Sequence, residues 1–74
     1  MKRDFQIRGE LITLDALLKV VGAADSGAQA KAMIADGLVR VDGETELRKT
    51  RKLRGGETVE TGDEVIVLKA DPSL

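Results

Sequence analysis

The chain has 74 residues, which is enough for one small domain but too few for a catalytic cleft between two domains. It has no cysteine and no histidine, which excludes disulfides, thiolate chemistry and the usual zinc ligands. We therefore expect no metal site, no cofactor and no catalytic residues. The longest apolar run is only a few residues, so we expect a cytoplasmic protein that does not enter a membrane.

Charge is distributed unevenly along the chain. The formal net charge of −1 taken alone argues against binding to a polyanion, because phosphate recognition depends on a positive surface. Residues 26–54, however, contain seven Lys or Arg against four Asp or Glu, whereas residues 55–74 contain one basic and five acidic residues. A compact fold could present such a chain as one basic and one acidic face.

The first predicted elements are a short strand and a helix. Phe5 and Ile7 alternate with polar neighbours, as in a strand with one buried face. Thr13 is the expected cap of a helix that ends at Gly22 in a left-handed conformation. The apolar residues of this helix have the i, i+3, i+4, i+7 spacing of a single face: Leu14, Leu17, Leu18 and Val21.

A second helix is predicted between Ser26 and Gly37. Ser26 and Gln29 have the spacing of a capping box, in which each side chain satisfies a free backbone amide of the other residue. Gly27 and Lys31 are four residues apart and share a face that is available to a partner. The opposite face is expected to meet the core through Ala30, Met33 and Ile34.

The remainder of the chain predicts a small sheet. A strand is expected over residues 38–41, followed by a two-residue hairpin turn at Asp42–Gly43, because both positions tolerate positive φ. Strands over 58–59 and 65–68 are joined across Gly62–Asp63, and the last is apolar enough to be central. The predicted fold class is α+β, with two short N-terminal helices followed by a small, mainly antiparallel β-sheet.

The segment from Arg48 to Arg54 is the main candidate for a binding site, since five of its seven residues are basic and none is acidic. It is either a solvated loop or part of a surface for phosphate groups. Crowded like charges cost stability, and the acidic residues nearest to the segment lie outside it, at Glu44, Glu46 and Glu57. Further phosphate contacts are expected from side chains and from free amides at the start of the second helix: Lys31, Arg40, Ser26 and Gly27.

Several of these residues together resemble the RNA-binding domain first described in small-subunit ribosomal protein four, also called the alpha-L motif. Within that family, the chain resembles the stand-alone, YbcJ-like small bacterial proteins. The resemblance covers about residues 12–68 of a single domain that spans residues 1–74. It rests on the order and spacing of the segments 26–31, 39–43, 48–49 and 62–65, with Ile34 and Gly37 between them.

The resemblance implies a protein that binds structured RNA, often ribosomal or transfer RNA, and that does no catalysis. It implies that the following residues bind RNA: Ser26, Gly27, Lys31, Arg40, Arg48, Lys49, Arg51, Lys52 and Arg54. Many family members have Arg where this chain has Gly27, and Asn where it has Asp42, so contacts at these two positions differ from the family pattern. Phe5 is the only aromatic residue, which argues against base stacking and favours contacts to phosphates and to the shape of the RNA.

Three other functions are alternatives to RNA binding. An enzyme lacks support, because no nucleophile with a base, phosphate loop or metal-ligand cluster is present. Gly62 to Val65 also resembles part of a ubiquitin-like sulfur carrier, but the Gly-Gly pair of this chain is internal, at Gly55–Gly56. The remaining alternative is a protein-interaction module, in a ribosome-associated complex, whose basic face docks on an acidic partner. The sequence indicates no small-molecule substrate and determines neither the particular RNA nor the oligomeric state.

Overall fold

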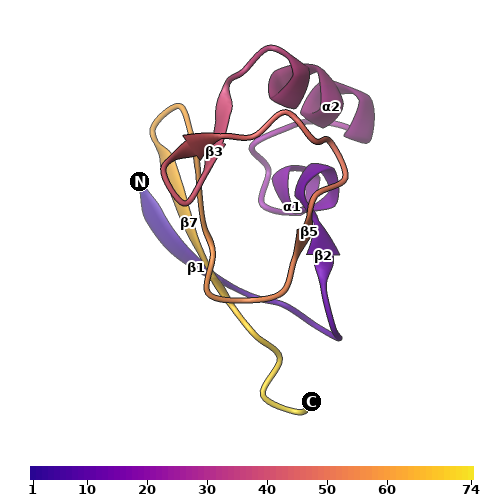
Figure 1. The fold of residues 1–74 in the computed structure, drawn as a ribbon, viewed down its shortest axis with the longest axis vertical. Coiled ribbons are helices and arrows are strands. Elements are labelled where there is room, and N and C mark those ends of the chain that lie inside the picture. The colour runs from indigo at the N-terminus through magenta and orange to yellow at the C-terminus, as the bar shows by residue number, and fades with distance from the viewer.

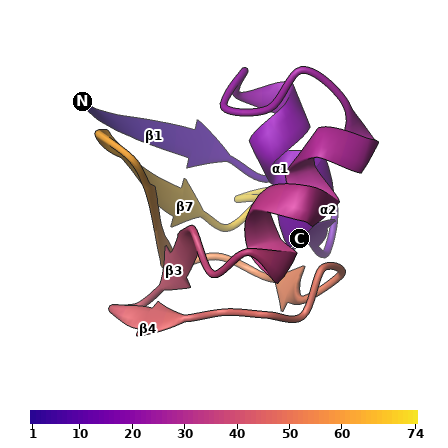
Figure 2. The same ribbon diagram turned by 90° about the horizontal axis from the view of Figure 1, so that it is seen from above.

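The computed structural model describes residues 1–74, which fold into a sheet with two helices packed on one of its faces (Figures 1 and 2). The helices are α1 (Leu14–Val20) and α2 (Gly27–Ala35). Neither helix is long and apolar enough to span a bilayer. The two layers enclose one hydrophobic core.

The main sheet has five strands in the order β1-β7-β6-β3-β4. Their bounds are β1 Lys2–Gln6, β7 Glu64–Lys69, β6 Thr58–Thr61, β3 Val39–Val41 and β4 Glu44–Thr45. β1 pairs with β7 in parallel, and the other three pairings are antiparallel. Two further short strands, β2 (Ile12–Thr13) and β5 (Lys52–Leu53), form a separate antiparallel ladder.

The α+β class is confirmed, but the predicted order of elements is only partly right. The helices do not precede the whole sheet, because β1 comes first in the chain and forms one of its edges. The sheet is mixed, since β1 lies parallel to the last strand, β7. The strand at 65–68 is paired on both sides as expected, between β1 and β6.

Glycines with positive φ end both helices as predicted. Gly22 has a φ of 81° after α1, and Gly37 has a φ of 76° after α2. At the end of α2, the amide of Leu38 donates to the carbonyl of Met33 at 3.1 Å, and that of Gly37 donates to Ile34 at 3.1 Å. This pair of bonds is the Schellman arrangement, which satisfies two of the last free carbonyls of the helix.

The helix starts differ in detail from the prediction. The Thr13 side chain accepts no capping hydrogen bond, because carbonyls from a distant segment, residues 49–51, satisfy the first amides of α1 instead. At α2, Ser26 Oγ accepts from the Gln29 amide at 3.1 Å, as predicted. The Gln29 side chain accepts from the amide of Asp25 rather than from that of Ser26.

The predicted turn at Asp42–Gly43 is present between β3 and β4. Its two residues have φ values of 52° and 85°, the pattern of a type I′ turn, whose twist matches that of paired strands. Asp42 Oδ1 also accepts from the amide of Thr58 at 2.9 Å. The turn is thereby tied to the neighbouring strand β6.

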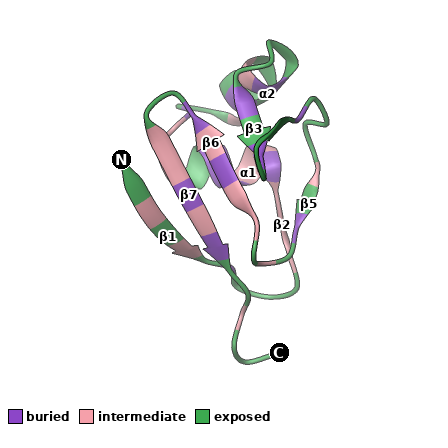
Figure 3. Ribbon diagram, turned by 60° about the vertical axis from the view of Figure 1, so that its left-hand side comes forward, coloured by how far each residue is buried: buried purple, intermediate pink, exposed green.

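The core lies between the sheet and the helices, where the buried residues gather (Figure 3). The helix residues expected to face it do so, since Ala30 and Ile34 are fully buried and Met33 is partly buried against the core. In β3, Val39 and Val41 point inward and Arg40 is exposed on the other face of the sheet. That outer face is covered by no other element of the chain (Figure 2).

Candidate nucleic-acid interface

The basic turn, defined here as residues Arg48–Lys52, is fixed to the N-terminal end of α1. The amide of Leu14 donates to the carbonyl of Arg51 at 2.9 Å, and that of Asp15 donates to the carbonyl of Lys49 at 3.1 Å. Directly after the turn, the side chain of Leu53 is fully buried in the core. The loop that leads into the turn runs from β4 beneath α2 to β5 (Figure 2). The turn is therefore held by two hydrogen bonds from α1 and by the burial of Leu53, the residue that follows it.

A buried carboxylate, Glu46, binds two arginines of the basic turn. It accepts from Arg48 Nε at 3.1 Å, from Arg48 Nη2 at 2.9 Å and from the Arg48 amide at 2.9 Å. It also accepts from Arg51 Nη1 at 2.8 Å. The hydrogen bonds from the Arg48 side chain, helped by the Arg48 amide and by Arg51, outweigh burial and lower the pKa of Glu46 to about 2. Glu46 is therefore ionised at neutral pH.

Helix α2 contributes Lys31 beside the basic turn. Lys31 Nζ lies 4.0 Å from Asp15 Oδ2, and the backbone amide of the same Asp15 is bound to the turn. Gly27 lies one helical turn before Lys31, and the amides of Gly27 and Ala28 donate no hydrogen bond within the protein. Lys31 and the turn thus both contact Asp15, at the N-terminal end of α1.

Four of the five residues of the turn line a shallow hollow that contains no apolar side chain: Arg48, Thr50, Arg51 and Lys52. The basic cluster is defined here as Lys31, Arg48, Lys49, Arg51 and Lys52. These five side chains have ion pairs with only two carboxylates, those of Asp15 and Glu46. The cluster therefore keeps three net positive charges.

One of the sequence-predicted residues, Arg40, lies apart from the basic cluster. Arg40 points to the outer face of the sheet, where Arg40 Nη2 lies 3.5 Å from Glu60 Oε2. Arg54 follows β5, beyond the buried Leu53, and its backbone amide donates to Glu57 Oε2 at 3.0 Å. The structure thus places Lys31 beside the turn, with Ser26 and Gly27 at the start of the same helix, and it places Arg40 on the outer face of the sheet. Arg54 does not line the hollow formed by the turn.

Sequence reasoning did not assign a role to Asp15 or Glu46. Glu46 was regarded only as an acidic residue outside the basic segment, although its position carries a signal. The amide of Glu46 donates to the carbonyl of Val39 at 3.0 Å, which continues the β3–β4 pairing by one residue. Strand alternation then turns Glu46 to the buried side, because Thr45 is exposed.

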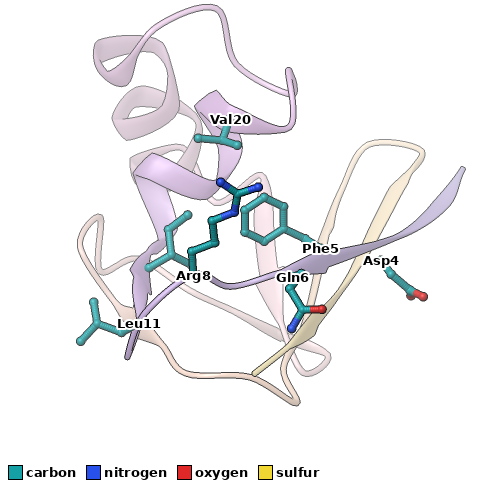
Figure 4. A pocket seen from close by; sticks show the side chains of 7 residues that line it. Asp4, Phe5, Gln6, Arg8, Leu11 and Val20 are labelled. Atoms are coloured by element: carbon teal, nitrogen blue, oxygen red, sulfur yellow. The ribbon is translucent and has the colours of Figure 1, made fainter. Parts of the chain in front are cut away.

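A second hollow lies between β1 and α1 and shares no residue with the basic cluster. Phe5, Leu11, Ile12 and Val20 supply its apolar wall, and Arg8 extends past the ring of Phe5 toward Val20 (Figure 4). Phe5 is half-buried and packs against the core. The single aromatic ring of the chain is thus not part of the basic cluster.

Comparisons with known proteins agree with the fold and with the family resemblance. The S4 domain family model matches residues 5–69. The putative RNA-binding protein YbcJ of Escherichia coli (strain K12) is 52% identical over 48 residues, which cover 65% of this chain and 69% of that protein. The uncharacterized protein YbcJ of Shigella flexneri matches with the same identity and coverage.

A solved structure shows the same fold. The solution structure of Escherichia coli YbcJ, which revealed an alpha-L motif involved in RNA binding, superposes with a TM-score of 0.69 at 40% identity. The match covers 90% of this chain and 86% of that one. This chain therefore belongs to the S4 domain family and has the alpha-L fold.

Proposed function

We propose that this protein binds structured RNA, such as ribosomal or transfer RNA, through the basic cluster and the N-terminal end of α2. The observation that carries the proposal is that Lys31 of α2 lies beside the basic turn, so that two separate segments supply five basic residues with only two carboxylates paired to them. Membership of the S4 domain family, and the RNA-binding names of the YbcJ relatives, support the same ligand. The proposed activity is binding, without a chemical step.

The mode of binding follows from the side chains present. Arg48 and Arg51 present planar guanidinium groups, which suit phosphate oxygens. Lys49 and Lys52 have no ion pair, and the free amides of Gly27 and Ala28 add weaker donors. The half-buried Phe5 lies outside the cluster, so we expect contacts to the backbone and to the shape of a folded RNA rather than to stacked bases.

A pair of double variants tests the proposal. Lys49→Ala/Lys52→Ala removes two unpaired charges from the cluster and leaves no carboxylate without its partner. Lys2→Ala/Lys69→Ala removes two charges from the outer face of the sheet and is the matched control. Binding of fluorescent transfer RNA is measured by anisotropy between about 50 and 200 mM salt, where phosphate contacts are strongly salt-dependent.

We expect the cluster variant to bind more weakly and to reduce the slope of log affinity against log salt by about two, roughly one for each lysine. The control should lose less affinity and keep most of the slope. Transfer RNA should also compete better than heparin of equal charge, and better than an unstructured strand of equal length. Equal losses in the two variants, or equal competition by heparin, would refute the proposal.

A further inference from the structure

Glu46 is a buried acidic side chain placed directly under the proposed binding surface, where its charge opposes the binding of a polyanion. It is 7% exposed, and its two carboxylate oxygens accept from both Arg48 and Arg51. These two arginines line the same hollow with Thr50 and Lys52. A carboxylate that is unfavourable for RNA in charge therefore stands at the centre of the most basic part of the chain.

We propose that Glu46 is a positioning residue, which holds the guanidinium groups of Arg48 and Arg51 side by side so that both can donate to one RNA phosphate in the hollow. This inference rests on the proposed function and deepens it. Each guanidinium carries more N–H donors than Glu46 occupies, so donors remain for a phosphate.

The geometry gives Glu46 a means of reducing the cost of binding. The Arg48 side chain is 73% exposed and would otherwise sample many rotamers, which would have to be lost when RNA binds. Two hydrogen bonds from Arg48 to one carboxylate fix both the position and the plane of its guanidinium. Preorganised donors bind more tightly than mobile ones because less entropy is lost.

The Glu46→Gln variant separates positioning from charge, because the two effects have opposite signs. Removal of a negative charge from a basic surface should tighten RNA binding if only net charge matters. Loss of the positioning should weaken it, by about tenfold, which equals the lower end of the loss in affinity when the hydrogen-bond partner of a metal-binding side chain is removed. Glu44→Gln on β4 is the matched control, since Glu44 is exposed, has no ion pair and should bind as tightly as the wild type or slightly more tightly.

A second pair of variants excludes a purely structural role for Glu46. Arg48→Lys/Arg51→Lys keeps both charges but loses the paired planar donors, and it should weaken transfer RNA binding by a similar factor. In that background, Glu46→Gln should no longer weaken binding and should tighten it slightly, because only the loss of a negative charge remains and no paired planar donors are left to be positioned. Circular dichroism at the assay temperature reports whether each variant is folded. If Glu46→Gln unfolds, the arginine variant is compared with Lys49→Arg/Lys52→Arg, which should bind as the wild type does.

The outcomes distinguish this inference from the proposed function. If the wild type fails to bind transfer RNA, the proposed function falls and this inference falls with it. If the wild type binds and folded Glu46→Gln binds equally well or more tightly, the positioning role is refuted and the proposed function stands. The positioning role is also refuted, and the proposed function also stands, if Arg48→Lys/Arg51→Lys binds transfer RNA as well as Lys49→Arg/Lys52→Arg does. Weaker binding by both Glu46→Gln and the arginine variant, without additivity, supports the role.

Discussion

Acidification should weaken the fold through the Glu46 carboxylate. The pKa of Glu46 is lowered from 4.5 to about 2, chiefly by the hydrogen bonds from the Arg48 side chain. Because the pKa in the folded state lies below that in the unfolded state, the contribution of Glu46 to stability is complete above pH 4.5 and is lost as the pH falls toward 2.

The size of this effect follows from the structure. A fall in pKa from 4.5 to about 2 corresponds to about 3 kcal/mol at full strength. The carboxylate itself is buried, but the Arg48 side chain is 73% exposed, so solvent screens part of the interaction. We therefore expect about 1 to 2 kcal/mol of the free energy of unfolding to depend on the ionisation of Glu46.

Urea unfolding followed by circular dichroism measures this contribution. The free energies of unfolding of the wild type and of Glu46→Gln are compared from about pH 7 to about pH 2.5. Their difference should be constant above about pH 5 and should shrink by about 1 to 2 kcal/mol at the acidic end. The pKa of Asp71 is also lowered to about 2, by the Gly9 amide and by Ser73. Asp71 is present in both proteins, so its contribution cancels in the difference between their free energies of unfolding. A difference that does not change with pH would refute the reasoning.

Three further predictions concern the anchoring and the charge of the binding surface. Gly55→Ala should destabilise the fold by about 2 kcal/mol or more, since φ is 119° and an added Cβ would lie 2.6 Å from the Ala70 backbone nitrogen; thermal unfolding measures this. Leu53→Ala should cost about 2 to 5 kcal/mol in urea unfolding, whereas Leu38→Ala, at an exposed position, should stay within about 0.5 kcal/mol, and equal costs would contradict the packing. A Cβ added at Gly27 would meet no atom within 4 Å, so Gly27→Arg should be accommodated and should steepen the salt dependence of RNA binding by about one, as measured by anisotropy; an unchanged dependence would place Gly27 outside the interface.

Local chemistry made much of the fold predictable from the sequence. Gly22 and Gly37 end the helices, and Asp42–Gly43 forms the hairpin turn, because few other residues adopt positive φ at low cost. The core face of α2 follows from the helical period alone. These features depend on residues close together in the chain.

Long-range pairing was not predictable in the same way. The parallel contact of β1 with β7 joins residues more than sixty positions apart, and no local pattern of either strand specifies its partner or direction. The same limit applies to α1, whose first amides bind carbonyls of the basic turn rather than the Thr13 side chain. The composition of the basic segment suggested a binding surface, but it did not indicate which contacts hold that segment in place.

The candidate site was only partly predictable for a related reason. The exposed position of Arg40 between Val39 and Val41 and the family resemblance placed it with the basic segment, but strand alternation turns its side chain to the outer face of the sheet, where it meets Glu60. The same alternation turns Glu46 toward the buried side, which makes an apparently incidental carboxylate the partner of two arginines. The distribution of charge along the sequence indicates the class of ligand that the protein binds. The face of the sheet on which each charged side chain lies depends on the register of the strands.

Amide chemical shifts of the labelled protein, recorded during titration with folded transfer RNA, test the central claim most directly. If RNA binds at the proposed surface, the largest shifts will fall on residues 26–31 and 48–52, and they will diminish as salt is added. The outer face of the sheet, including Arg40, should change little. The largest shifts on that outer face, or no shifts at low salt, would contradict the account.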